Sequence, residues 1–273
     1  MILAAIPWSV NPEIFRIPAF ELFNLEIGPI AVRYYGLFWA LSFYIGYEIL
    51  LRIFKRENVS VKELEHLIIY IAVGSIIGAR LGHCFFYAWD YYSQNLIEIL
   101  FIWEGGLASH GGAFGIVIAL LLFKKYKSSQ KAIWTLDRLV IPISLAAAFI
   151  RLGNLMNSEI YGIETSLPWG FIFENRGETL AKHPTQLYEA LAYLVLFASL
   201  LWIYIKKSKN LRNGLLSGIF AIGMFTARFL IEFIKEPQES FEADMMINMG
   251  QILSIPMIIT GFVLLYYSYK EKL

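Results

Sequence analysis

The fold class of this chain is decided by the stretch HLIIYIAVGSIIGARLGHCFFYA, residues 66–88. The run is long enough to cross a bilayer as a helix, which takes about 20 apolar residues. Six other runs share its apolar character, although Pro142 interrupts one of them. We therefore predict seven membrane spans, at residues 34–52, 66–88, 107–123, 133–151, 185–205, 213–234 and 246–267.

The composition excludes the main alternatives to a membrane protein. Of 273 residues, 58% are hydrophobic and 16% are charged, whereas about 25% are charged in an ordinary soluble domain. This excludes a soluble globular enzyme and a disordered chain. The net charge of +1 indicates no affinity for nucleic acid, and the single cysteine, Cys84, permits no intrachain disulfide. We predict one all-α polytopic membrane domain, residues 1–273.

Two segments lie outside the predicted spans. Residues 1–32 combine aromatic residues with prolines and lack a basic N-terminal run, which favours an interfacial arm over a cleaved signal peptide. Residues 152–184 form the longest loop and predict a small head between spans four and five.

Lysine and arginine are distributed unevenly about the spans. Fifteen of them follow spans one, three, five and seven, and five lie at the opposite ends. Positive charge flanking membrane helices accumulates on the cytoplasmic side. The N-terminus and the head are therefore expected outside, and the C-terminus in the cytoplasm.

Three arginines remain inside or at the ends of the spans: Arg80, Arg151 and Arg228. An arginine near the bilayer centre costs about 2.5–3.5 kcal/mol on the insertion scale, so such residues face a cavity, a partner or a ligand. The predicted topology places all three in the outer half of the bilayer, at the depth of His110 and Tyr35. Because arginine binds phosphate bidentately and stays charged, the cluster indicates a site for a phospholipid headgroup.

Each of these residues also has a purely structural interpretation. Arg228 could pair with Glu232, which lies four residues on and on the same helix face. Arg80 could extend to the outer interface. His110 could hydrogen-bond a carbonyl group, or it could take a proton from a nucleophile.

Glycine recurs at every fourth position in three predicted spans. The positions are Gly74, Gly78 and Gly82, then Gly111 and Gly115, then Gly214 and Gly218. Small residues at this spacing let helices approach closely, so we expect these glycines to be helix contacts.

Residues 151–162, RLGNLMNSEIYG, closely resemble the signature of bacterial prolipoprotein diacylglyceryl transferases, roughly G-R-x-G-N-F-x-N-x-E-x-x-G. Further segments resemble the same family and follow in family order: residues 33–36, 78–82, 105–112, 183–189, 228–233 and 249–254. The chain departs from the family pattern at Ala79, Ile150, Leu155 and Lys235. It also has Met224 where some members have a tyrosine, so no role of that tyrosine carries over.

The resemblance implies an activity. The diacylglyceryl group of phosphatidylglycerol is transferred to the thiol of the lipobox cysteine of a preprolipoprotein, a thioether forms, and glycerol phosphate leaves. It also implies a multi-pass protein of the bacterial cytoplasmic (inner) membrane with its active site towards the outer leaflet. Neither a cofactor nor a metal is expected, and the protein is expected to be a monomer. Acyl-chain preference, Gram type and the number of lipid sites stay open.

The resemblance and the chemistry together suggest residue roles. Arg151 and Arg228 are expected to bind the phosphate and, with His110, to form the catalytic set. His110 is the candidate base for the thiol, and orientation of the lipid is its open alternative. Gly162 is expected to permit a tight turn of the head. Glu232 is expected to hold the guanidinium group of Arg228 in its orientation. The full set expected to bind substrate is Tyr35, Arg80, Arg151, Asn154, Asn157, Glu159, Gly162, Arg228 and Glu232.

Three other functions fit the pattern less well. A transporter or flippase would suit intramembrane charges, but no inverted repeat is visible and the charges gather at one leaflet. A scaffold would bind phospholipid and leave it unchanged. A phospholipid hydrolase would release diacylglycerol without a thiol acceptor.

Overall fold

The computed structural model of the chain describes residues 5–22, 25–102, 105–106, 108–237 and 245–270. It divides into two compact units. Unit 1 comprises residues 1–46 and 139–273, and unit 2 comprises residues 47–138. Two helices run through both units, α1 (Tyr34–Arg56) and α5 (Ala132–Met156).

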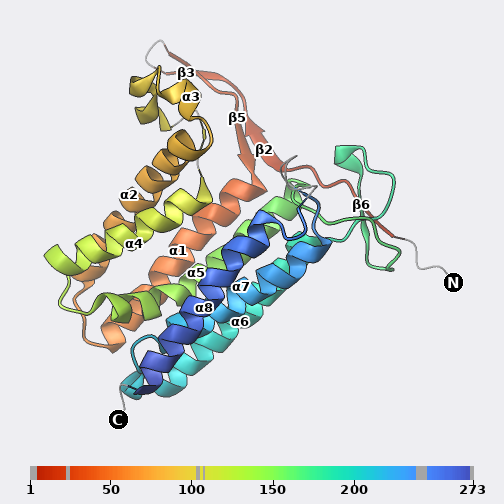
Figure 1. Ribbon diagram of the computed structural model, residues 1–273. Helices are drawn as coiled ribbons and strands as arrows, with labels where there is room; N and C mark the ends of the chain where they lie inside the picture. Colours follow the sequence, from red (N-terminus) through yellow and green to blue (C-terminus); the bar gives the residue numbers. More distant parts are fainter. Residues whose placement is uncertain (1–4, 23–24, 103–104, 107, 238–244, 271–273) are drawn as a thin grey trace. The chain divides into compact units, whose positions relative to one another are not determined.

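Unit 1 is mainly helical. Besides its parts of α1 and α5, it contains α6 (Thr185–Lys207), α7 (Leu215–Ile231) and α8 (Met249–Lys270). Helix α7 packs against both α6 and α8, and the three lie side by side (Figure 1). A Cβ added at Gly218 would lie 2.9 Å from the carbonyl oxygen of Gly261 on α8, so Gly218 is a helix contact as predicted. Gly214 instead precedes α7, with φ of 86°, a conformation that favours glycine.

Short strands, which the all-α prediction missed, form the arm and part of the head. Strand β1 (Ile6–Trp8) pairs in parallel with β6 (Phe171–Phe173). The other two pairs are antiparallel: β2 (Glu13–Ile17) with β5 (Ile30–Arg33), and β3 (Phe20–Leu22) with β4 (Leu25–Ile27). Strands this short give a weak periodic signal, and the backbone groups of the arm obtain their hydrogen bonds by pairing.

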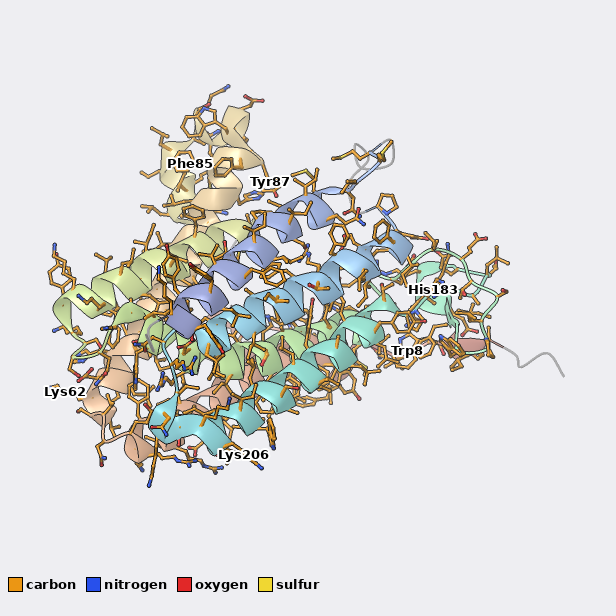
Figure 2. All side chains as sticks on the ribbon, turned by 60° about the horizontal axis from the view of Figure 1, so that its bottom comes forward. Trp8, Lys62, Phe85, Tyr87, His183 and Lys206 are labelled. Carbon is orange, nitrogen blue, oxygen red and sulfur yellow. The ribbon has the colours of Figure 1, made fainter. Side chains whose placement is uncertain are left out.

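The head is fixed to the end of α5 by aromatic packing. The Trp8 ring stacks on Phe171 with centroids 5.0 Å apart, and its indole N–H donates to the Leu155 carbonyl over 3.1 Å. Figure 2 shows Trp8 and His183 at one end of unit 1 and Lys206, near the end of α6, at the other. The head therefore lies where α5 ends and α6 begins.

Unit 2 contains a closely packed helix pair. Its elements are α2 (Val61–Phe86), α3 (Trp89–Tyr92), the 3-10 turn η1 (Leu96–Leu100) and α4 (Ser109–Tyr126). Helices α2 and α4 lie side by side (Figure 1) and antiparallel, because Gly74 faces Gly115 while Gly82 faces Gly111. A Cβ at Gly115 would collide with the Gly74 carbonyl oxygen. These glycines are helix contacts, as predicted.

Among the described residues, six helices are long and apolar enough to cross a membrane. They are α1, α2, α5, α6 extended to Asn210, α7 extended to Ile234, and α8. The remaining predicted span, residues 107–123, corresponds to α4, which is a helix of 18 residues but is not among the six. The chain is thus a multi-pass helical membrane protein. Helix α5 continues through Pro142, as membrane helices allow.

We expect Gly115→Ala to destabilise unit 2. The added methyl group must separate α2 and α4, and overpacking of this kind costs about 1–3 kcal/mol. Gly112→Ala is the matched control on the same helix, because its Cβ would meet nothing closer than 3.5 Å. Thermal unfolding in detergent checks this: equal midpoints for the two variants would contradict the packing interpretation.

Candidate functional site

The predicted site residues are distributed over both units. Unit 1 contains most of them, on the N-terminal end of α1, the C-terminal end of α5, the following loop, and α7. Unit 2 contains Arg80 and His110. The side chain of His110, at the start of α4, lies outside the described residues.

The signature segment is organised around the carboxylate of Glu159. Arg151, in the last turns of α5, donates from Nη1 to Asn154 Oδ1 over 3.3 Å. Asn154 is buried and donates to Glu159 Oε1 over 2.8 Å, and Asn157 donates to the same oxygen over 3.2 Å. The predicted residues Arg151, Asn154, Asn157 and Glu159 thus form one hydrogen-bonded group.

The backbone after α5 turns sharply to bring Glu159 back. Ser158 and Ile160 adopt φ of 52° and 61°, in the left-handed region that non-glycine residues seldom occupy. The Glu159 amide donates to the Asn154 carbonyl over 3.0 Å, and Gln186 donates to the Glu159 carbonyl over 2.7 Å. Strained backbone held by such contacts is common at functional sites.

Gly162 contributes close packing and not the predicted tight turn. Its φ is not positive, and it forms an antiparallel bridge with Lys235. A Cβ there would collide with the Ile234 carbonyl oxygen and lie 2.8 Å from side-chain atoms of His183 and Thr185. Only glycine lets the head approach the segment after α7 this closely.

Glu189, on the first turns of α6, binds Arg151 and was missed by the sequence analysis. Its side chain is fully buried, and Oε2 lies 2.9 Å from Arg151 Nε. Lys235 Nζ lies 3.4 Å from the same oxygen, and the Tyr193 hydroxyl donates to Oε1 over 3.3 Å. The argument from the cost of charge within a membrane, applied to basic residues alone, does not identify Glu189. The same argument applied to acidic residues identifies Glu189, in the fifth position of a predicted span.

Glu232 pairs with Lys235 and not, as predicted, with Arg228. Helix α7 ends at Ile231 and a 3-10 turn follows, which brings Glu232 Oε2 to 3.3 Å from Lys235 Nζ. Both side chains are buried. Gly250 at the start of α8 leaves room for this carboxylate, since a Cβ there would lie 2.6 Å from Glu232 Oε1.

Arg228 lies one turn before Glu232 and is half-buried. Glu232, in turn, contacts Lys235, which contacts Glu189, so Arg228 precedes by one turn a residue of the ion-pair group that includes Arg151. The Arg228 side chain makes no ion pair or hydrogen bond with the described residues. The N–H groups of the Arg228 guanidinium are therefore available to bind an anion.

Tyr35 packs on the same helix end as Arg151. A Cβ at Gly153 would lie 2.7 Å from the Tyr35 ring, so a larger residue at position 153 would displace the tyrosine. The structure thus brings eight predicted residues together in unit 1: Tyr35, Arg151, Asn154, Asn157, Glu159, Gly162, Arg228 and Glu232.

In unit 2, the Arg80 guanidinium is occupied by backbone. It donates to the carbonyl oxygens of Ile99 over 3.0 Å and Glu98 over 2.6 Å, and to that of Gly105. It also lies over the Tyr92 ring, 5.0 Å from its centroid. These contacts fix the segment between α2 and α4. The Arg80 side chain therefore neither extends to the outer interface nor leaves its guanidinium free to bind phosphate, the two roles predicted for it.

A second charge cluster lies in the head. Lys182 Nζ lies 2.7 Å from Glu236 Oε1 and 3.6 Å from Glu178 Oε2, and the hydrogen bond to Glu236 raises the pKa of Lys182. Burial, together with a hydrogen bond to Glu178, raises the pKa of Tyr161 to about 12. This cluster ties the head to the segment after α7.

No group of three or more His, Cys, Asp or Glu among the described residues is arranged to hold a metal ion.

The sequence model of one family, described as prolipoprotein diacylglyceryl transferase, matches residues 22–267. The chain belongs to this family. Three curated relatives carry the name phosphatidylglycerol–prolipoprotein diacylglyceryl transferase. The relative from Tolumonas auensis is 46% identical, covering 91% of this chain and 95% of that protein. Those from Chloroherpeton thalassium and Porphyromonas gingivalis are 42% and 43% identical, and cover 97% and 99% of this chain and 94% and 97% of their own. The resemblance seen in the motifs is confirmed.

We expect Asn154→Asp to lower transferase activity by about 10- to 100-fold, the range set by losing a hydrogen bond to a charged group. The new carboxylate faces Glu159 without a proton to donate. The exchange Asn154→Asp with Glu159→Gln restores one donor and one acceptor and should regain part of the activity. Initial rates of the single and double variants check this, and a double variant no better than the single one would contradict the hydrogen-bond assignment.

Proposed function

We propose that this chain transfers the diacylglyceryl group of phosphatidylglycerol to the thiol of the lipobox cysteine of a preprolipoprotein. A carbon–sulfur bond forms, the bond between the glyceryl carbon and the phosphate oxygen breaks, and glycerol phosphate leaves with the electron pair. The observation that carries the proposal is the guanidinium of Arg151, held by Glu189 and Asn154 in the same unit as Arg228, in a chain whose relatives are named for this reaction. Two arginines suit a phosphate whose negative charge increases as the bond breaks.

Arg151 and Arg228 bind the phosphodiester and stabilise the leaving phosphate. In a poorly hydrated site such interactions are stronger than in water, and they act most in the transition state, where charge develops. Asn154, Asn157 and Glu159 orient Arg151 and offer groups to the headgroup glycerol. Tyr35, packed on Gly153, contacts lipid or thiol at the mouth of the site.

The substrate supplies the nucleophile, so the enzyme must promote loss of a proton from a thiol of pKa about 8.5. His110 is our candidate for that base, and orientation of the lipid is the alternative role. Arg80 acts indirectly, by fixing the segment that precedes α4.

The fifteen cations that follow alternate spans support an N-terminus outside and a C-terminus in the cytoplasm. This topology directs the Arg151 end of α5 to the outer leaflet. We place the enzyme in the bacterial cytoplasmic membrane as one monomeric membrane domain, residues 1–273, with an extracytoplasmic head at 152–184.

We expect Arg151→Ala to abolish turnover and Arg151→Lys to restore little of it, because lysine lacks the bidentate fork. Purified protein in detergent is mixed with phosphatidylglycerol and a peptide bearing Leu-Ala-Gly-Cys, and mass spectrometry follows the diacylglyceryl adduct on sulfur. Arg16→Lys is the control, since Arg16 is an exposed arginine paired with Glu13 in the arm. Near-normal turnover of Arg151→Ala would remove it from the site. If the wild type consumes lipid without forming the adduct, the protein is a hydrolase, and if it leaves the lipid intact, the transporter interpretation gains support.

His110→Asn tests the proposed base. If His110 takes the thiol proton, the variant should lose most of its activity at pH 6–7 and regain part of it towards pH 9, where the thiol ionises without help. Rates from pH 6 to pH 9 measure this. Activity retained across the whole range would assign His110 to lipid orientation or to structure.

A further inference from the structure

The carboxylate of Glu189 is shared among three partners in unit 1. Oε2 lies 2.9 Å from Arg151 Nε and 3.4 Å from Lys235 Nζ, while Oε1 accepts from the Tyr193 hydroxyl. Glu189 and Lys235 have side chains that are 0% and 1% exposed. Lys235 in turn contacts Glu232, so two cations and two anions alternate along a buried line from Arg151 to Glu232.

Arg151 is held differently from the two buried arginines of unit 2. Arg138 directs both Nε and Nη2 to the Glu57 carboxylate and Nη1 to a carbonyl oxygen. All three nitrogens of Arg80 donate to carbonyl oxygens. In both of those guanidinium groups, every nitrogen has an acceptor within the protein itself.

Glu189 contacts Arg151 as an ion pair, with Oε2 2.9 Å from Nε but without a hydrogen bond to it, while Tyr193 and Lys235 donate to Oε1. Asn154 Oδ1 accepts from Nη1 over 3.3 Å. Among the described residues, Arg151 therefore donates a hydrogen bond from Nη1 alone, and Nη2 keeps its two N–H groups available. Two donors are the number needed for a bidentate phosphate contact.

We propose that Glu189 is a positioning residue for Arg151, and that Lys235 is the counter-ion that keeps Glu189 from cancelling the Arg151 charge. The inference rests on the proposed function, because the group being positioned is the phosphate-binding arginine. It assigns different effects to the two partners: Glu189 sets the orientation of the guanidinium, and Lys235 sets the net charge that the anionic lipid meets.

Removing either partner should therefore change the kinetics in a different way. Glu189→Gln leaves the shape nearly unchanged but raises the net charge by one and replaces the anion beside Nε with a neutral amide. We expect kcat to fall about tenfold or more, while KM for phosphatidylglycerol stays equal or decreases. Lys235→Met removes one positive charge, so KM should rise about three- to tenfold. Lys235→Arg keeps the charge and should keep the wild-type KM.

The double variant Glu189→Gln with Lys235→Met separates orientation from charge. It leaves Arg151 without Glu189 and Glu232 without Lys235, so its unfolding midpoint is measured to distinguish a loss of stability from a loss of orientation. Its net charge equals that of the wild type, so KM should return to the wild-type value. The anion beside Nε is still absent, so kcat should remain low.

The experiment is the adduct assay at varied phosphatidylglycerol concentration, with thermal unfolding measured for each variant. Glu164→Gln is the matched control, since Glu164 is 62% exposed in the head. An inactive wild type would refute the proposed function. An active wild type with unchanged kcat in both Glu189→Gln and the double variant would refute the positioning role alone. Equal changes of kcat and KM in proportion to lost stability would make Glu189 a structural residue and overturn the inference.

Discussion

The burial of one carboxylate, that of Glu189, constrains the whole of unit 1. An ionised carboxylate among membrane helices is tolerated only with cationic partners and hydrogen bonds. Arg151 from α5 and Lys235 from the segment after α7 supply the charge, and Tyr193 supplies a hydroxyl. Helices α5, α6 and the end of α7 must therefore meet at this carboxylate.

The head makes that meeting possible. Lys235 follows α7 and reaches Glu189 because the preceding backbone bridges to Gly162, where the Ile163 amide donates to the Ile234 carbonyl over 3.0 Å. Gly162 lacks the Cβ that would prevent this approach. Lys182 adds a second tie through Glu236. The head thus holds in place the residues that surround Arg151. This explains why the signature segment contains both the arginine and this glycine.

The helices were predictable because apolar length is a strong signal. All seven predicted spans are helices, with ends displaced by a few residues; α5, for example, continues five residues beyond the predicted end at Arg151. The strands of the arm were not predictable, because segments such as Phe20–Leu22 are too short to show a period. The partner of Glu232 was mispredicted, because the spacing of four assumes a continuous helix, whereas α7 ends at Ile231.

The sequence alone does not distinguish a buried arginine that binds backbone from one that can bind a ligand. Arg80 and Arg151 look alike in sequence, since each lies near the outer end of a predicted span. Their functions can be distinguished only from the groups that each guanidinium contacts in the structure. Carbonyl oxygens that engage every nitrogen of Arg80 fix a segment of backbone, whereas a carboxylate shared with Lys235 leaves Arg151 with donors to offer. A buried arginine is therefore a candidate ligand for phosphate to the extent that its acidic partner is itself neutralised by another cation. Lys235, which replaces the arginine common in the family, retains the charge that this neutralisation requires.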